Sequence, residues 1–429
     1  MSATNNDLFI NWLKKEVTPA LGCTEPVAIA FAAATASKYL NEPCLNISGF
    51  ISENLYKNAI GVTIPGTCFS GVDMAAAVGV CAGDPDKGLE TLKGINASQI
   101  EQADAMVKND AVSISARDTP DFIHIDLTAT GATQRCRVVI RKSHTRITEL
   151  YVNDQPIPFS MQTCCDADEA ELKQFSIEEA FDFVNRASFE DIAFILEAAR
   201  LNGALSEEGR KKPYGLNISG TLSTAVSQGL MGDDLLSRIA IETVAASDAR
   251  MGGAPVTAMS NFGSGNQGVA ATLPVVVLAR ELQASEDELA RALALSHLTA
   301  ISVHSRYTRL SALCAASTAA MGAAAGMAWL FTRDLQVIQT AIINMISDVS
   351  GIICDGASNS CAMKVSSVTM SAFRAVLMAK QGVRVSDHDG IVSEGAEQSI
   401  NNLCRLVTKA MPHTDKEIIR IMAEKRQQA

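Results

Sequence analysis

The sequence has little positive charge and lacks the compact motifs of a nucleotide-binding protein. Its 36 Lys and Arg residues are outnumbered by 47 Asp and Glu residues, which gives a net charge of −11, whereas a nucleic-acid-binding protein usually carries a basic face. The Gly-rich stretch Asn261–Gly268 lacks the lysine and the serine or threonine of a Walker loop, and it does not open a βαβ unit. We therefore expect no nucleic-acid partner, and no nucleotide at this stretch.

A secretory signal is also lacking, because residues Met1–Asp7 contain no basic segment followed by an apolar core. The 11 Cys residues then indicate a reducing compartment, and we expect a cytoplasmic protein. Leu310–Thr332 carries no charged side chain and is long enough to span a bilayer. It consists mostly of Ala, Gly, Ser and Met, and small residues suit a helix packed among other helices. We predict a buried central helix here and no membrane association.

The hydrophobic pattern divides the chain into two parts and predicts an α+β fold. Residues 7–39 are typical of helix with a break near Thr18–Pro19, and residues 44–52 alternate as a strand does. Three further alternating segments between residues 123 and 152 predict a three-stranded meander. From Ile177 onward, Ala-rich apolar segments separated by Gly and Pro predict helices. We expect a mixed α/β domain with a small sheet over residues 1–165 and a large all-α helical domain over residues 166–429.

Two thiols, Cys354 and Cys361, flank a loop of small polar residues within apolar helical sequence. Such a loop lets two sulfur atoms converge and leaves backbone N–H groups facing an anion or the sulfides of a cluster. Cysteine is the usual ligand of iron–sulfur centres, and Cys314 is the leading candidate for a third ligand. Three thiolates on a four-iron cluster would leave one iron open as a Lewis acid. Spacing alone leaves a second interpretation open, in which these are core cysteines beside a polar loop.

The loop Ala20–Glu25 precedes Pro26, a residue that suits the first turn of a helix. Cys23 therefore lies at a predicted helix start. The positive end of a helix favours a thiolate or binds an anionic substrate group. The sequence thus predicts a second chemically active loop, far from the Cys354–Cys361 loop along the chain.

Four segments, in chain order, resemble the L-cysteine desulfidase family. They are Pro19–Pro26, Val62–Thr67, Ser264–Gly268 and Cys354–Lys364. The resemblance covers nearly the full chain, and the family is related more distantly to the iron–sulfur L-serine dehydratases, whose α-type domain carries the cluster. The resemblance implies an oxygen-sensitive [4Fe–4S] cluster and conversion of L-cysteine to pyruvate, ammonia and sulfide without pyridoxal phosphate. Cys314, Cys354 and Cys361 match the cluster ligands of the family, and Cys23 matches its amino-terminal cysteine motif.

Elimination of sulfide needs a base for the weakly acidic Cα proton and stabilisation of the leaving thiolate. An open iron is soft enough to bind that sulfur, and a thiolate at Cys23 is the expected base. The expected contacts for the ammonium and carboxylate groups of a small amino-acid substrate are Thr24, Glu25, Lys57, Asn58 and Asn266, each with a structural role as the alternative.

Two other functions stay open on the sequence. One is an L-serine or other hydroxy-amino-acid dehydratase with the same cluster, although this chain has Gly22-Cys-Thr-Glu where serine dehydratases carry a Ser- and His-rich motif. The other is a cluster-free protein that binds a small amino acid in the same cleft. Ala-rich helical surfaces also allow a homodimer.

Overall fold

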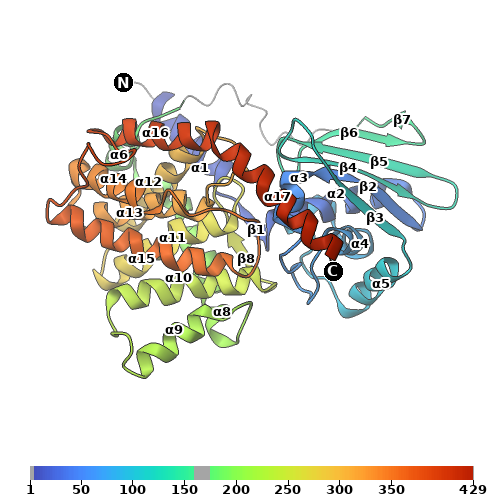
Figure 1. The fold of residues 1–429 in the computed structure, drawn as a ribbon, viewed down its shortest axis with the longest axis horizontal. Helices are drawn as coiled ribbons and strands as arrows, with labels where there is room; N and C mark the ends of the chain where they lie inside the picture. The colour runs from blue at the N-terminus through green and yellow to red at the C-terminus, as the bar shows by residue number, and fades with distance from the viewer. Residues whose placement is uncertain (1–3, 159–173, 429) are drawn as a thin grey trace.

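The computed structural model describes residues 4–158 and 174–428 and contains two unequal parts (Figure 1). A mixed α/β part with a sheet lies on the right of the figure, and a larger body of packed helices lies on the left. The predicted α+β architecture is confirmed. The predicted domain boundary at residue 165, like Cys164 and Cys165, falls outside the described residues.

The α/β part is built on a six-stranded sheet with the strand order β3-β2-β4-β5-β6-β7. The neighbours β2 and β3 run parallel, and the other pairs are antiparallel. The strands are β2 (Asn46–Ser52), β3 (Val112–Arg117), β4 (His124–Thr130), β5 (Arg135–Arg141), β6 (Ile147–Val152) and β7 (Gln155–Pro156). Because β4, β5 and β6 pair in sequence order, the predicted meander is confirmed.

Helices cover one face of this sheet, and their apolar side chains form a core with it. The helices of this part are α2 (Thr24–Leu40), α3 (Glu53–Ala59), α4 (Val72–Ala82) and α5 (Ala97–Lys108), with a short 3-10 segment, η1 (Pro85–Glu90). Helix α2 packs on β4 and β5 and on α4. Its Ala residues at 28, 30, 32 and 33 are fully buried, so these small side chains let the helix approach its neighbours closely.

The helical part surrounds an uncharged, Ala-rich central helix, α13. Its helices are α1 (Thr4–Glu16), α6 (Ile177–Arg186), α7 (Phe189–Ile192), α8 (Leu196–Lys211), α9 (Ile218–Ser227), α10 (Leu235–Met251), α11 (Gly265–Glu281), α12 (Glu286–His304), α13 (Ala315–Thr332), α14 (Leu335–Val349), α15 (Cys361–Lys380), α16 (Ala396–Lys409) and α17 (Met411–Gln428), with a 3-10 turn, η2 (Ala193–Ile195). Helix α13 contacts α11, α12, α14 and α15 and is buried from residue 316 to 329. The predicted buried central helix is confirmed. In the part of the chain that the structure describes, no helix has the length and apolarity needed to cross a membrane.

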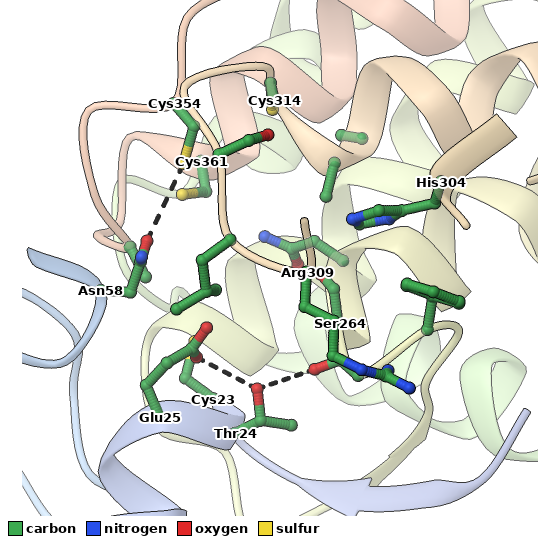
Figure 2. Close-up of a pocket in the computed structure, with 18 of the residues that line it drawn as sticks. Cys23, Thr24, Glu25, Asn58, Ser264, His304, Arg309, Cys314, Cys354 and Cys361 are labelled. Atoms are coloured by element: carbon green, nitrogen blue, oxygen red, sulfur yellow. Dashed lines mark hydrogen bonds between the residues drawn. The ribbon is translucent and has the colours of Figure 1, made fainter. Parts of the chain in front are cut away.

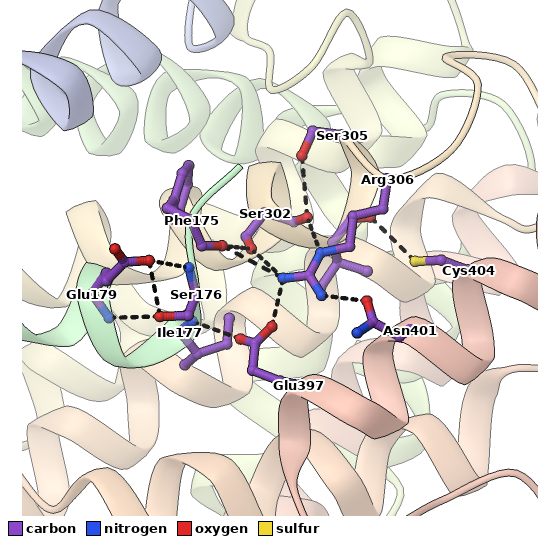
Figure 3. Close-up of polar contacts among 11 residues, drawn as sticks. Phe175, Ser176, Ile177, Glu179, Ser302, Ser305, Arg306, Glu397, Asn401 and Cys404 are labelled. Atoms are coloured by element: carbon purple, nitrogen blue, oxygen red, sulfur yellow. Dashed lines mark hydrogen bonds and ion pairs between the residues drawn. The ribbon is translucent and has the colours of Figure 1, made fainter. Parts of the chain in front are cut away.

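A polar cluster fastens the start of α6 to α12 and α16 (Figure 3). The guanidinium of Arg306 donates to Glu397 at 2.7 Å and to Asn401 at 2.8 Å. The other carboxylate oxygen of Glu397 accepts from the N–H of Ile177 at 2.8 Å. Ser176 and Glu179 cap α6 reciprocally. The entry into the helical part is therefore fixed by three elements that are distant in sequence.

Two further connections hold the two parts together. Strand β1 (Pro19–Leu21) pairs antiparallel with β8 (Thr257–Met259), so a segment just before α2 lies beside a segment just before α11. At the other end of the chain, α17 runs from the helical body across to α3 (Figure 1). These two connections place the loops identified from the sequence against one another.

Candidate functional site

A buried cavity lies where the two parts meet, and the predicted chemical residues line it (Figure 2). Its volume is about 80 Å³. Because one water needs roughly 10–15 Å³ by this measure, the space suits a small molecule rather than a nucleotide. Of the predicted residues, those that line the cavity are Cys23, Thr24, Glu25, Asn58, Asn266, Cys314, Cys354 and Cys361.

The β1–β8 pair brings the Cys23 loop to the start of α11. Register pairs Pro19 with Met259, and each strand then leads within a few residues to a helix that begins at the cavity. Cys23 is the N-cap residue of α2, and Ser264 is the N-cap residue of α11. The hydroxyl of Thr24 donates to the carbonyl of Gly263 at 2.8 Å and so joins the two loops.

A short antiparallel bridge places Cys314 beside Cys354. Leu313 pairs with Ile353. The N–H of Cys314 donates to the carbonyl of Ile352 at 3.0 Å, and the N–H of Cys354 donates to Ala312 at 2.8 Å. The two sulfur-bearing residues therefore leave adjacent backbones toward one cavity, as Figure 2 shows.

Cys361 joins them because the loop after Cys354 folds back through Gly356. This glycine has φ +107°, and a Cβ there would lie 2.5 Å from the carbonyl oxygen of Lys57, so only glycine fits the turn. Cys361 is the first residue of α15. The thiol of Cys354 lies 3.8 Å from the amide oxygen of Asn58, which ties the loop to α3.

Four helices begin at this cavity: α2, α11, α13 and α15. Cys23 and Cys314 are the N-cap residues of α2 and α13, and neither makes a side-chain capping bond. The positive ends of the four dipoles therefore point at one small volume, although at α15 the first N–H groups are already bonded to carbonyls of the preceding loop. The arrangement favours anionic groups such as thiolates, cluster sulfides or a carboxylate.

Burial works against the thiolate forms of the cavity cysteines. Burial raises the pKa of Cys314 to about 12 and that of Cys361 to about 11, and in each case the neighbouring Cys354 adds to the rise. Burial likewise raises the pKa of Cys23 to about 12, against a smaller lowering by Arg250. The expectation that the helix start makes Cys23 a thiolate is therefore corrected, because burial disfavours the charged form of its thiol. A coordinated metal deprotonates a thiol outright, so Cys314 and Cys361 can become thiolates as ligands.

The donor set suits an iron–sulfur cluster better than a single ion. Within the described residues, no three His, Cys, Asp or Glu side chains are grouped so as to hold one metal ion. A single zinc ion binds sulfur at about 2.3 Å, which draws its ligands together, whereas a four-iron cluster offers each thiolate an iron of its own. Cys314 and Cys361 at helix starts and Cys354 in the loop between them face one cavity, and thiols are the donors that such clusters use.

Lys57 takes a different position from the substrate contact that its sequence context suggested. Its ammonium group is fully buried, pairs with Asp415 of α17 at 2.5 Å, and donates to the carbonyl of Cys354 at 3.3 Å. It is not among the residues that line the cavity. The pair instead joins α3, α17 and the loop of Cys354.

Replacing Lys57 with methionine is expected to lower the free energy of unfolding by about 3–5 kcal/mol, because Asp415 would remain buried without a counter-charge. Lys57→Met/Asp415→Leu should recover most of this loss, since an apolar pair can replace a buried ion pair. Lys38→Met is the matched control. Lys38 pairs with Asp86 on the surface, so the expected change is below about 1 kcal/mol. Urea titration of the four proteins gives the comparison, and equal losses for Lys57→Met and Lys38→Met would contradict it.

The sequence interpretation did not single out four polar residues that also line the cavity: His144, Arg250, His304 and Arg309. Arg309 forms a two-fold ion pair with Glu16 at 3.0 and 2.9 Å. Arg250 is buried, and its neighbours Ser247 and Asp248 made it look like part of an ordinary polar turn of α10. The histidines gave no local signal, because only the fold brings them to the cavity.

A chain of buried amides and imidazoles supports the cavity wall. Nδ1 of His304 lies 2.7 Å from Oε1 of Gln267, and Nε2 of Gln267 donates to Oδ1 of Asn261 at 2.8 Å. Nδ2 of Asn261 lies 2.9 Å from Nδ1 of His297. Burial lowers the pKa of His297 and His304 to about 3 each, and burial lowers the pKa of His144 equally. All three imidazoles are therefore neutral in the folded protein near pH 7.

Stability should fall as the pH drops from 7 to 5. Below an ordinary pKa of 6.5, the unfolded chain binds a proton at each of these three histidines, and the folded chain does not until about pH 3. Each histidine then contributes a slope of up to about 1.4 kcal/mol per pH unit. Glu25 and Asp248, whose pKa values are raised by burial, act in the opposite sense.

Urea midpoints measured at several pH values test this expectation. His297→Gln should reduce the slope by up to about 1.4 kcal/mol per pH unit, and His388→Gln is the surface control, because the His388 side chain is 93% exposed. If His297→Gln leaves the slope unaltered, the assignment of His297 as a buried, neutral imidazole is wrong.

The fold and the cavity define a class: an α+β protein whose helical part carries three cysteines facing one cavity. Residues 86–420 match the sequence profile of the serine dehydratase alpha chain. The chain belongs to the serine dehydratase alpha chain family. It is 64% identical over 425 residues to a UPF0597 protein of Klebsiella pneumoniae, with 99% of this chain and 100% of that protein covered. It is 48% identical over 424 residues to the UPF0597 protein YhaM of Escherichia coli, with 97% of each chain covered.

The matched range contains part of the site. Arg250, Asn266 and the three cysteines Cys314, Cys354 and Cys361 lie within it, whereas Cys23 and Glu25 lie before it. The cysteine-bearing wall thus comes from the part that matches the serine dehydratase alpha chain, and the opposite wall comes from the amino-terminal part.

Proposed function

We propose that the protein is a lyase that uses a [4Fe–4S] cluster to eliminate sulfide from L-cysteine. The observation that carries this proposal is the cavity itself. Cys314, Cys354 and Cys361 occupy one wall, and Cys23 and Glu25 occupy the other. When bound, the cluster supplies an open iron that acts as a soft Lewis acid toward the leaving sulfur.

Glu25 is the group in the chain best suited to take the Cα proton. Burial raises the pKa of its carboxyl above the ordinary 4.5, and Arg250 opposes that rise only in part. A carboxylate whose pKa moves toward neutrality is an effective general base. Its position is fixed by Thr24, whose hydroxyl donates to it at 3.1 Å and also contacts Gly263. The proposed base is therefore Glu25, and not Cys23 as expected from the sequence.

The bonds and protons balance as follows. Glu25 accepts the proton from Cα, the Cα electron pair forms the Cα–Cβ double bond, and the Cβ–S electron pair leaves with sulfur. Cys23, whose pKa is raised to about 12 by burial, would turn its thiol from Met251, the acceptor at 3.6 Å, and donate a hydrogen bond to the departing sulfur. Glu25 then returns its proton to the sulfide. The aminoacrylate tautomerises and reacts with water to give pyruvate and ammonia.

A second candidate, an L-serine dehydratase, is favoured by the match to the serine dehydratase alpha chain. The same residues would then act on a hydroxyl leaving group. Oxygen is a harder ligand than sulfur. The rates of pyruvate release from L-cysteine and from L-serine therefore distinguish the two candidates.

Anaerobic reconstitution with iron and sulfide, followed by product analysis, tests the proposal. The full chain should bind about four irons, as a [4Fe–4S] cluster requires, and release equal amounts of sulfide and pyruvate from L-cysteine. Faster pyruvate release from L-serine would favour the second candidate. A protein that binds no iron and converts neither amino acid would contradict both.

A further inference from the structure

Arg250 is a buried cation that forms no ion pair with a carboxylate of the described residues, and Glu25, on which its charge acts, lines the same cavity. Arg250 lies near the end of α10, is 3% exposed and lines the cavity. Among the described residues, no carboxylate lies within 4.0 Å of its guanidinium, whereas Arg309 and Lys57 are paired with Glu16 and Asp415. An unpaired buried charge is costly. Its persistence at a cavity wall therefore points to an anionic ligand.

The donors of this guanidinium have few partners: the Cys23 thiol, one carbonyl and one thioether. Nε donates to the carbonyl of Gly22 at 3.1 Å, and Nη1 lies 3.3 Å from the thioether of Met251, a weak acceptor. A guanidinium has five N–H donors in a planar fork that matches a carboxylate. Within the described chain, Gly22 supplies the one oxygen atom that accepts from it. Most of the fork thus remains available to a ligand.

The start of α11 lies directly against this guanidinium. A Cβ on Gly265 would approach Nε of Arg250 to 2.2 Å, so the glycine keeps the helix start in contact with the charge. The side chain of Ser264 caps the N–H of Gln267, and the N–H groups of Gly265 and Asn266 have no partner within the helix. A helix start and an arginine together form a carboxylate site.

We propose that Arg250 and the first turn of α11 bind the α-carboxylate of the substrate, so that the cavity selects free α-amino acids over their esters. This inference rests on the proposed function in that the ligand is the amino acid undergoing elimination. The carboxylate neutralises Arg250. A carboxylate site at this position also explains why Gly265 begins α11, since a larger residue there would displace the guanidinium of Arg250.

The test compares a free and a masked carboxylate. In Arg250→Gln, kcat/KM for L-cysteine should fall by about 10- to 150-fold, the range expected for a lost charge-assisted interaction. For L-cysteine methyl ester, kcat/KM of the same variant should change by less than about 3-fold. The wild-type preference for the acid over the ester should therefore disappear. Arg280→Gln is the matched control, because Arg280 is an exposed arginine on α11, and it should alter neither substrate. Iron content should be the same in all proteins.

If Arg250 has only a structural role, Arg250→Gln should lower kcat/KM equally for L-cysteine and its ester. That result would overturn the inference. Should Arg250→Gln fail to fold, Gly265→Ala takes its place and should give the same selective loss for the acid. Calorimetric binding of L-alanine, which has no leaving group, separates this inference from the proposed function. If the wild type releases no sulfide but binds L-alanine, and Arg250→Gln does not, the lyase proposal fails and the carboxylate site stands. Equal binding by both proteins, or none by the wild type, overturns the carboxylate site.

Discussion

Cys354→Ala is expected to lose most of its bound iron and to release sulfide from L-cysteine at a rate lower by on the order of 1,000-fold, because the cluster is held by its thiolates. Cys354 is the central member of the set: its backbone pairs with the segment of Cys314, and its thiol faces Asn58. Cys314→Ala and Cys361→Ala should behave alike. Iron analysis and sulfide assay under anaerobic conditions give both quantities.

The matched control is Cys404→Ala. Cys404 is also buried in the helical part, but its thiol contacts the carbonyl of Val303 and does not line the cavity. Iron content and sulfide release should therefore remain close to wild type. If Cys354→Ala retains its iron, or if Cys404→Ala loses as much, the assignment of the ligands is wrong.

Glu25→Gln should lower kcat for sulfide release by about 10²- to 10⁴-fold, the contribution typical of a general base. Because burial raises the pKa of Glu25, activity in the wild type should fall as the pH drops through that raised value and the carboxylate gains a proton. In Glu25→Gln this acidic limb should be missing from the residual rate. A pH–rate profile of kcat/KM measures it.

Glu101→Gln provides the comparison, since Glu101 is exposed on α5. It should preserve both the rate and the acidic limb. Retention of the limb in Glu25→Gln would show that another group takes the Cα proton, and Cys23 would then be tested next as the base.

Much of the fold was predictable because it depends on local patterns. Alternating residues placed β4, β5 and β6 in sequence order, and the uncharged Ala-rich segment placed α13 at the centre. Two features were not predictable. The β1–β8 pair and the contact of α17 with α3 join segments that lie hundreds of residues apart, as the 358-residue separation of Lys57 and Asp415 shows. Local hydrophobic period carries no information about such partners.

The site was predictable to the extent that its residues stand in unusual loops. Cys23 and Cys354 stand in such loops, and Glu25, Cys314 and Cys361 stand at the helix starts beside them. The structure brings all five to one cavity, where their roles stay predictions. The ion pair of Lys57 with Asp415 on the last helix was not predictable, because the residues next to Lys57 in the sequence do not reveal a partner so far along the chain. Arg250 was not predicted as a site residue, because its importance depends on its lack of an ion pair among the described residues, which only the folded structure shows.

The most direct test of the three-cysteine cluster site is the Mössbauer spectrum of the protein reconstituted anaerobically with ⁵⁷Fe, recorded with and without L-cysteine. Three cysteine ligands and one open iron predict that about one quarter of the iron signal shifts when L-cysteine is added, while the rest is unchanged. A spectrum without cluster iron, or one in which L-cysteine shifts no iron, would contradict the account.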